Sequence, residues 1–153
     1  MEKILRLSDF SRVDFSRAIN EIYERTDYNT RQYQEYYKWF FQKSIPRVLD
    51  KKGDILFAME GFRIIALANI KNTLEEKKIC TLLVEEEYRK KGLGTKLLLE
   101  SFSILNTSKP VITIEEGKLK EYMSFINEFN WKETSSTKIY TNNEIIFNEN
   151  TCK

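Results

Sequence analysis

The chain has 153 residues, which is enough for one domain with its own core, and its 41% hydrophobic and 31% charged residues exclude an intrinsically disordered chain. Its 25 basic and 23 acidic side chains leave a net charge of +2, which is too balanced to predict bulk binding to nucleic acid. The sequence contains no histidine, which excludes Ser-His-Asp and Cys-His mechanisms and removes the commonest metal ligand.

The two cysteines predict neither a disulfide framework nor a metal site. Cys80 lies inside a predicted strand, and Cys152 is one of the last three residues. No window approaches the ~18 apolar residues of a membrane span, and the first six residues lack the shape of a signal peptide. We therefore expect a soluble, cytoplasmic protein with a single domain over residues 1–148 and a disordered tail over residues 149–153.

Hydrophobic periodicity predicts the elements of the first half of the chain. They are a strand over residues 3–7, helices over 13–23 and 33–41, and strands over 55–59 and 62–70. We expect residues 27–30 to form a loop that caps the second helix, and Pro46 to end or redirect that helix. Glu60 and Gly61 are expected to form the hairpin turn between the two later strands.

The second half begins with a run rich in branched residues, which predicts a strand buried on both faces over residues 79–84. The remaining predicted elements are helices over 95–105 and 119–129 and strands over 110–114, 131–133, 137–141 and 144–147. The element order, βααβββαβα followed by β, favours one mixed α/β domain.

The segment from Leu82 to Leu98 carries the clearest functional signal. A predicted strand runs into a basic loop with two glycines, Gly92 and Gly94, and the loop opens directly into a helix. The glycines let backbone N–H groups converge, and the helix adds unpaired N–H groups and the positive end of its dipole. This arrangement predicts a phosphate or pyrophosphate site, with a turn surrounded by solvated lysines as the alternative.

Two familiar phosphate-binding loops do not match this segment. The dinucleotide pattern G-x-G-x-x-G fails because Leu97 stands at the third glycine, and the Walker pattern is absent. The stretch Arg89-Lys90-Lys91-Gly92-Leu93-Gly94 instead resembles motif A of the GNAT (N-acetyltransferase) superfamily, R/Q-x-x-G-x-G/A. Val84 and Tyr88 stand where that family often has a strand-ending valine and a tyrosine. The resemblance implies an α/β fold with a mixed, mostly antiparallel sheet, a splayed parallel pair and flanking helices.

The resemblance also implies acetyl-CoA as the cosubstrate, an amine as the acceptor and no metal. The pantetheine arm would pair with the main chain of Leu82, Leu83 and Val84. The pyrophosphate would be held by Arg89, Lys90, Lys91, Gly92, Leu93, Gly94 and Thr95. The parallel neighbour of the cofactor strand is expected at residues 111–114. Neither nucleic acid nor a membrane is an expected partner, and a homodimer stays open.

Catalysis in this family is direct attack of a neutral amine on the thioester, with an acid to protonate the leaving thiolate. Many members carry this acid as a tyrosine at the position that matches Ile126 here, and isoleucine cannot donate a proton. Tyr122 lies one turn earlier on the same predicted helix face and is the substitute we expect, with a core or rim tyrosine as the alternative. The family's asparagine near the start of this helix is also missing, because Leu119 or Lys120 falls there.

The candidate bases are carboxylates that follow the two parallel strands, namely Glu85, Glu115 and Glu116, and each has a surface carboxylate as its alternative. Cys80 permits a thiol relay, but a small buried hydrophobe is favoured. The aromatic residues between Tyr33 and Phe41 either wall the acceptor site or form core and dimer contacts.

Three functions therefore stay open. The first is an N-acetyltransferase whose acceptor the sequence does not identify. The second is a catalytically weak GNAT-fold module that binds acyl-CoA as a sensor or binds a partner, and the missing tyrosine and asparagine motivate it. The third is nucleic-acid binding through the lysines of residues 71–96, which the near-neutral charge argues against.

Overall fold

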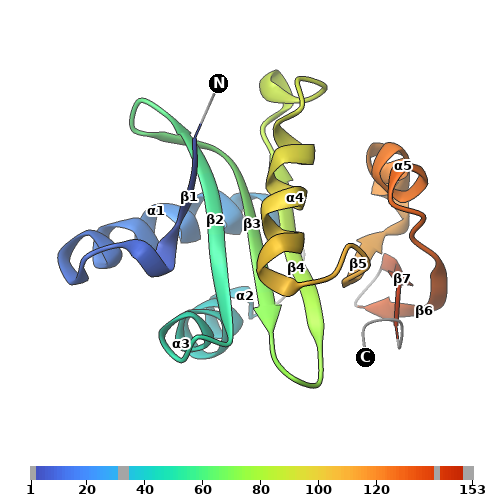
Figure 1. The fold of residues 1–153 in the computed structure, drawn as a ribbon, viewed down its shortest axis with the longest axis horizontal. Coiled ribbons are helices and arrows are strands. Elements are labelled where there is room, and N and C mark those ends of the chain that lie inside the picture. Colours follow the sequence, from blue (N-terminus) through green and yellow to red (C-terminus); the bar gives the residue numbers. More distant parts are fainter. Residues whose placement is uncertain (1–2, 31–34, 140–141, 150–153) are drawn as a thin grey trace.

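The computed structural model describes residues 3–30, 35–139 and 142–149. For residues 27–30, 138, 139 and 142 it describes the backbone alone. Of the tail predicted over residues 149–153, the structure describes Glu149, and residues 150–153, with Cys152, lie outside the described ranges. One sheet of seven strands runs through the molecule in the order β1-β2-β3-β4-β5-β7-β6 (Figure 1). Every neighbouring pair is antiparallel except β4 and β5, which are parallel. The predicted α/β class and mixed, mostly antiparallel sheet are confirmed.

The strands follow the predicted order along the chain. They are β1 (Ile4–Arg6), β2 (Gly53–Glu60), β3 (Arg63–Asn72), β4 (Lys77–Val84), β5 (Val111–Glu115), β6 (Glu133–Ile139) and β7 (Asn142–Phe147). The two short strands predicted over 131–133 and 137–141 form the single strand β6, and residues 140 and 141 lie outside the described ranges. Gly61 makes the turn between β2 and β3 with a φ of +61°, a conformation that glycine adopts without a steric penalty.

The helices are α1 (Arg12–Thr30), α2 (Tyr36–Trp39), α3 (Ile45–Leu49), α4 (Leu93–Leu105) and α5 (Leu119–Glu128), with short 3₁₀ turns at Leu7–Asp9, Glu86–Tyr88 and Glu116–Lys118. The helices α1 and α4 are longer than the sequence predicts, and α5 ends one residue earlier than predicted. The loop predicted over residues 27–30 is wrong, because α1 continues through them. The buried hydroxyl of Thr26 is satisfied within α1, because it donates a hydrogen bond of 2.9 Å to the carbonyl of Ile22.

Pro46 redirects the second predicted helix without ending it. A π-helical turn over Phe40–Ser44 connects α2 to α3, and the N–H of Ile45 bonds to the carbonyl of Phe40. Pro46 then falls in the first turn of α3, where a missing N–H group costs little. Tyr33, at the start of the predicted helix, lies outside the described residues.

Two apolar layers cover the two faces of the sheet (Figure 1). On one face α4 and α5 pack against β2 to β5, with Leu97, Leu98 and Ile126 among the buried residues. On the other face α1, α2 and α3 cover β2 and β3 through Ile22, Phe40 and neighbouring aromatic rings. Alternate residues of β2 enter the two layers, as the pleat of a strand requires. The aromatic segment is therefore largely a part of the core.

The parallel pair separates soon after it forms. β4 and β5 are paired only at Lys78 with Val111 and at Ile79 with Ile112. Directly after Ile79 the register of β4 against β3 shifts, so that Cys80 is an extra residue in β4. Such a bulge bends a strand and increases its twist, which turns the rest of β4 away from β5. The predicted splay is thus present, and the bulge accounts for where it starts.

No helix in the described part of the chain combines the length and the hydropathy that crossing a bilayer needs.

Candidate active site

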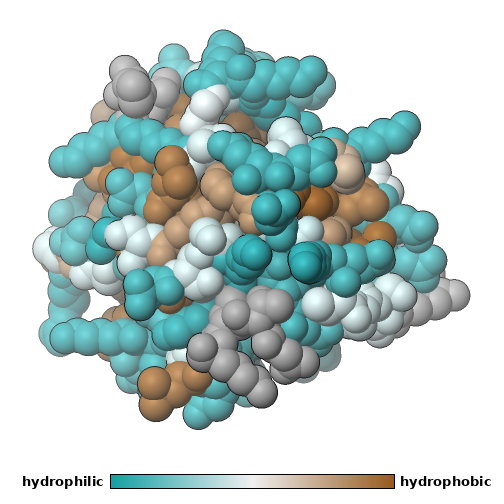
Figure 2. Space-filling model, turned by 45° about the vertical axis from the view of Figure 1, so that its right-hand side comes forward, coloured by the Kyte–Doolittle hydropathy of each residue, from teal (hydrophilic) through white to brown (hydrophobic). Residues whose placement is uncertain are grey.

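The separation of β4 from β5 opens a cleft of about 730 Å³. Its walls come from both strands, from the loop after β4, from the first turn of α4 and from α5. Figure 2 turns this side of the molecule toward the viewer and shows apolar surface surrounded by hydrophilic side chains. The lining of the cleft combines apolar residues such as Ile114 and Phe125 with charged ones such as Arg89, Lys90 and Lys120.

The position of β4 beside the cleft corrects one prediction. The strand was expected to be buried on both faces, but Ile79 is its one buried residue, and Leu82, Leu83 and Val84 are half-buried. These three residues line the cleft. One edge of their backbone is left without a neighbouring strand, because β5 has already turned away.

The glycine loop lies at the mouth of the cleft as a helix cap. Gly92 caps α4 with a φ of +85°, and the N–H of Lys96 bonds to its carbonyl at 3.0 Å. The helix begins at Leu93, two residues before the predicted start, so Gly94 lies in its first turn. By helix geometry the N–H groups of Leu93, Gly94 and Thr95 have no acceptor within α4.

The residues predicted to hold the coenzyme do not all reach the cleft. Arg89, Lys90, Gly92, Gly94 and Thr95 line it. The side chain of Leu93 is buried in the core, and the ammonium of Lys91 lies 5.9 Å from the centre of the Tyr88 ring. Lys90 adopts a φ of +62°, a left-handed conformation that a non-glycine residue rarely takes and that the sequence did not reveal.

The helix α5 reaches across the cleft to β4 and α4. The hydroxyl of Tyr122 donates a hydrogen bond of 3.1 Å to the carbonyl of Leu82. The ring of Phe125 lies so close to Gly94 that a Cβ atom there would be 2.9 Å from its edge. Arg89 donates from its Nε to the carbonyl of Val84 at 2.9 Å. Gly94 thus has a packing role as well as a place in the loop.

Tyr122 lines the cleft, and its surroundings favour the protonated phenol. Burial raises the pKa of Tyr122 to about 12, the charge of Glu121 raises it too, and Arg89 opposes both effects. The hydroxyl therefore keeps its proton at neutral pH. Ile126, the position at which many relatives carry the tyrosine, is buried in the core and does not line the cleft. The structure brings Tyr122 to the cleft in its place.

The three predicted carboxylates lie in different surroundings. Glu115, the last residue of β5, lines the cleft and is half-buried. Glu116 is exposed and accepts a hydrogen bond of 3.0 Å from the side-chain amide of Asn143. Glu85 is engaged by Arg25 at 2.9 Å and by Arg63 at 3.8 Å. Of these, Glu115 alone lies along the cleft among the described residues.

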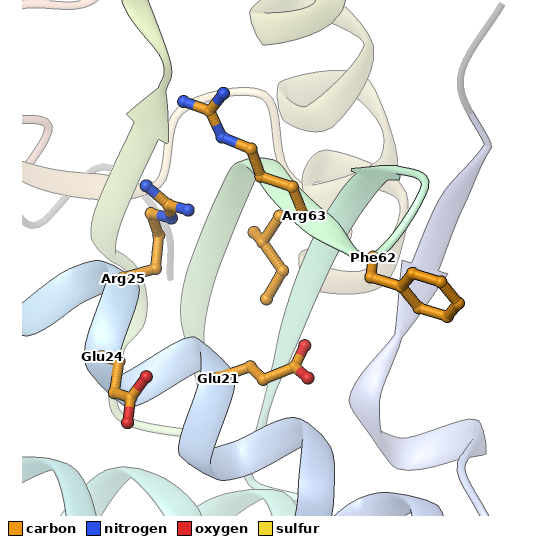
Figure 3. Close-up of a pocket in the computed structure, with 6 residues that line it drawn as sticks. Glu21, Glu24, Arg25, Phe62 and Arg63 are labelled. Atoms are coloured by element: carbon orange, nitrogen blue, oxygen red, sulfur yellow. The ribbon is translucent and has the colours of Figure 1, made fainter.

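The arginines that hold Glu85 border a second hollow, of about 440 Å³, between α1 and the start of β3. Figure 3 shows Arg25 and Arg63 extending toward the same side of it, one from α1 and one from β3. Arg63 also lies 3.9 Å from Glu87. These ion pairs tie α1 to the end of β4, which favours a structural role for Glu85.

Cys80 lies at the bulge and lines the cleft. Burial raises the pKa of its thiol, which disfavours the thiolate and so argues against a thiol relay. None of the described residues of the aromatic segment lines the cleft. Within the described residues, no group of three potential ligands is close enough to hold a metal ion.

Sequence reasoning missed several residues of the cleft. Lys118 and Lys120 face it from the start of α5, Phe125 closes against Gly94, and Thr26 reaches it from α1. The two lysines were visible as basic residues at the start of a predicted helix. Their position opposite the glycine loop depends on how α5 crosses the splayed strands, which no local pattern records.

Fold and site together define an α/β protein with a basic cleft between two splayed parallel strands. Residues 15–107 match the model of the Acetyltransferase (GNAT) family, and the chain belongs to this family. The predicted resemblance to the GNAT superfamily is thereby confirmed. No protein with curated annotation matches the chain by sequence.

Solved structures share the fold at low sequence identity. The PaiA N-acetyltransferase of Thermoplasma acidophilum, solved in complex with coenzyme A, superposes with a TM-score of 0.62 at 18% identity, over 97% of this chain and 99% of that one. A GNAT-family acetyltransferase of Bacillus cereus superposes with a TM-score of 0.65 at 16% identity, over 96% of this chain and 95% of that one. The ribosomal-protein-S18-alanine N-acetyltransferase of Escherichia coli superposes with a TM-score of 0.61 at 14% identity, over 96% of this chain and 92% of that one. Identities this low establish the common fold alone.

Proposed function

We propose that the protein transfers an acetyl group from acetyl-CoA to an amine acceptor by direct attack of the amine on the thioester. One observation carries the proposal: a single cleft joins the N-terminus of α4 at its mouth to the hydroxyl of Tyr122 on the backbone of β4. The family of the chain and the coenzyme A bound by its Thermoplasma relative support this choice of cosubstrate.

The charges along the cleft suit a polyanionic cosubstrate. Four cationic side chains line it, Arg89, Lys90, Lys118 and Lys120, against the two carboxylates of Glu115 and Glu121. The unpaired N–H groups of α4 would hold the pyrophosphate, since a helix N-terminus combines free donors with a positive dipole end. The cations would neutralise the remaining phosphate charge.

The pantetheine arm would lie along the open edge of β4. The carbonyl of Leu82 faces the gap, because the hydroxyl of Tyr122 reaches it from α5. In a strand the N–H and C=O groups of one residue point to the same side, and alternate residues share that side, so Val84 faces the gap as well. Leu82 and Val84 would therefore offer the arm a hydrogen-bonding edge, where the arm would replace or share the bonds that Tyr122 and Arg89 now donate to their carbonyls.

The reaction would proceed by one substitution at the thioester carbon. The amine nitrogen forms a bond to the carbonyl carbon, the C–S bond breaks, and the thiolate takes the proton of the Tyr122 hydroxyl. The proton lost by the amine passes to the carboxylate of Glu115, directly or through a water molecule. Burial raises the pKa of Tyr122 to about 12, so the hydroxyl carries its proton at neutral pH. A phenol with this pKa is a weaker acid than a thiol, so the placement of the hydroxyl in the cleft, and not its pKa, supports this role.

The second candidate function is an acyl-CoA-binding module without turnover. Ile126, a buried core residue, favours it, because the position at which many relatives carry the acid cannot supply one here. Under this reading Tyr122 serves only to close α5 on β4. The two functions share the coenzyme site and differ in chemistry.

Calorimetric titration with acetyl-CoA, followed by an assay of thiol release with a panel of primary amines, tests the proposal. We expect saturable binding and thiol release that depends on the amine. Binding without release over the whole panel would favour the module. An absence of measurable binding to acetyl-CoA and to free coenzyme A would refute both.

A further inference from the structure

Three contacts close α5 over the cleft from one face of the helix. Tyr122 bonds to the carbonyl of Leu82 at 3.1 Å, Phe125 packs on Gly94, and Glu121 lies 3.6 Å from Arg89. Residues 121, 122 and 125 are spaced so that their side chains can reach a common partner surface. Their partners all belong to the β4–α4 segment, the same segment that would bind the coenzyme.

We propose that α5 is a latch on the coenzyme slot, and that the coenzyme enters by displacing the Tyr122 hydroxyl from the Leu82 carbonyl. This inference rests on the proposed function, because it concerns the same cleft. The hydroxyl oxygen stands 3.1 Å from the strand edge along which the pantetheine arm would run. An arm lying on that edge cannot pass while the hydroxyl occupies it.

The attachment of α5 explains how the latch can open. Its C-terminal end is anchored, because Ile126 is buried and the ring of Phe129 packs on that of Phe102 in α4, with 4.9 Å between the ring centres. The indole of Trp131 adds a hydrogen bond of 2.9 Å to the carbonyl of Ser108. Toward the N-terminal end of α5, the three latch contacts reach the opposite wall, and Leu119 packs against the shared apolar core. The strands β4 and β5, which carry the two walls of the cleft, are paired at only two residue pairs.

The hydrogen bond of Tyr122 contributes more to the latch than the Arg89–Glu121 ion pair does. The Arg89–Glu121 pair is about half exposed on both sides, with 42% and 49% of the side-chain surface accessible, and exposed pairs contribute little. The Tyr122 hydroxyl is largely buried, so breaking its bond is the larger cost of opening. Opening has a second consequence, since it frees the hydroxyl for the thiolate and frees Arg89 for a phosphate.

The hydroxyl oxygen of Tyr122 is therefore expected to oppose the binding of coenzyme A and also to serve the protonation of the thiolate. The substitution Tyr122→Phe removes that atom and keeps the ring. We expect the variant to bind free coenzyme A about threefold to tenfold more tightly than the wild type, the range that corresponds to one hydrogen bond. Stopped-flow measurements should assign the gain to faster association, while kcat falls. A purely structural role would instead lower affinity, because the cleft would lose its shape.

The matched control is Tyr37→Phe, which removes the same atom from an exposed tyrosine outside the cleft and should leave coenzyme affinity unchanged. The second variant, Glu121→Gln, weakens the latch without touching the Tyr122 hydrogen bond, and we expect association to accelerate about twofold, as suits an exposed ion pair. It also keeps the test open if Tyr122→Phe does not fold.

The outcomes separate the two ideas. Equal or weaker coenzyme A binding by a folded Tyr122→Phe protein would overturn the latch and leave the proposed function standing. If that variant does not fold, unchanged association in Glu121→Gln would overturn the latch. If neither the wild type nor any variant binds coenzyme A, the proposed function fails and the latch with it.

Discussion

The two walls of the cleft are built differently. Both the β4–α4 wall and the β5–α5 wall contribute to one apolar core, which includes Leu97 of α4 and Ile126 of α5, but β4 is also hydrogen-bonded to β3 along its length. The β5–α5 wall is paired with β7 on its far side and meets β4 at two residue pairs. The first wall presents the glycine loop and the open strand edge, and the second presents Glu115, Tyr122 and the two lysines.

This difference suggests a division of labour. A site for a large anion benefits from donors that are fixed before binding, since ordering them afterwards costs affinity. Catalytic groups must instead let a long substrate enter and then close on it. Under the proposed function, the wall whose strand is paired along its length would serve coenzyme recognition, and the wall that meets β4 at two residue pairs would serve the chemistry.

The largest expected effect on acetyl-CoA affinity comes from a substitution in the β4–α4 wall. The substitution Gly92→Val places a branched side chain at a φ of +85°, although nothing lies within 4 Å of its Cβ, so the damage comes from backbone strain. The cap should reshape and its N–H groups should no longer converge. We expect acetyl-CoA affinity to fall at least about 100-fold by calorimetry, a loss of about 3 kcal/mol.

The matched control is Gly61→Val, which carries the same kind of strain at a φ of +61° with no atom within 4 Å, at the β2–β3 turn outside the cleft. It should lower the unfolding free energy by about 1–2 kcal/mol and leave affinity unchanged. Unchanged acetyl-CoA affinity in a folded Gly92→Val protein would remove the loop from the site.

A smaller effect is expected on the second wall. The substitution Glu115→Gln removes the carboxylate that lines the cleft, and we expect kcat/KM to fall about tenfold to 100-fold, with rescue at higher pH as the amine deprotonates in solution. Coenzyme affinity should not change. Glu116→Gln is the control, because glutamine keeps an oxygen for the hydrogen bond from Asn143. Equal rates in the two variants would exclude Glu115 as the base.

The smallest expected effect concerns pH and stability. The pKa of Tyr122 is about 12 in the folded protein, above the ordinary value of about 10. The raised folded value means that Tyr122 contributes stability below about pH 10 and loses it as pH rises toward its folded pKa. Urea unfolding of the wild type and of Tyr122→Phe should therefore converge by up to about 2 kcal/mol between pH 9 and pH 12. A constant difference between the two curves would contradict the burial of this phenol.

The sequence predicted the first wall better than the second. Arg89, Gly92 and Gly94 form a local pattern, and a strand, a glycine loop and a helix in direct succession leave few arrangements open. Even so, α4 begins two residues early, because Gly92 caps the helix before the second glycine. On the second wall, the strand and helix were predicted, but Lys118, Lys120 and Phe125 were not recognised as parts of the site.

The prediction for β4 failed for an instructive reason. A run of apolar residues is typical of a strand buried on both faces, and Leu82, Leu83 and Val84 fit that description. They are half-buried because the run borders an open cleft. A sequence pattern records hydrophobicity, and it does not record whether protein or a ligand will cover the side chains.

By itself the sequence determined the α/β class, the order of the elements and the glycine loop at a helix start, because each depends on residues close together in the chain. Tertiary structure alone decided where β4 leaves β5, which helix position faces the gap, and which carboxylate remains along it. The bulge at Cys80 sets the first, the packing of α5 brings Tyr122 rather than Ile126 to the cleft, and Arg25 and Arg63 engage Glu85. Each of these depends on contacts between segments far apart in the chain, whose register and geometry local patterns do not specify.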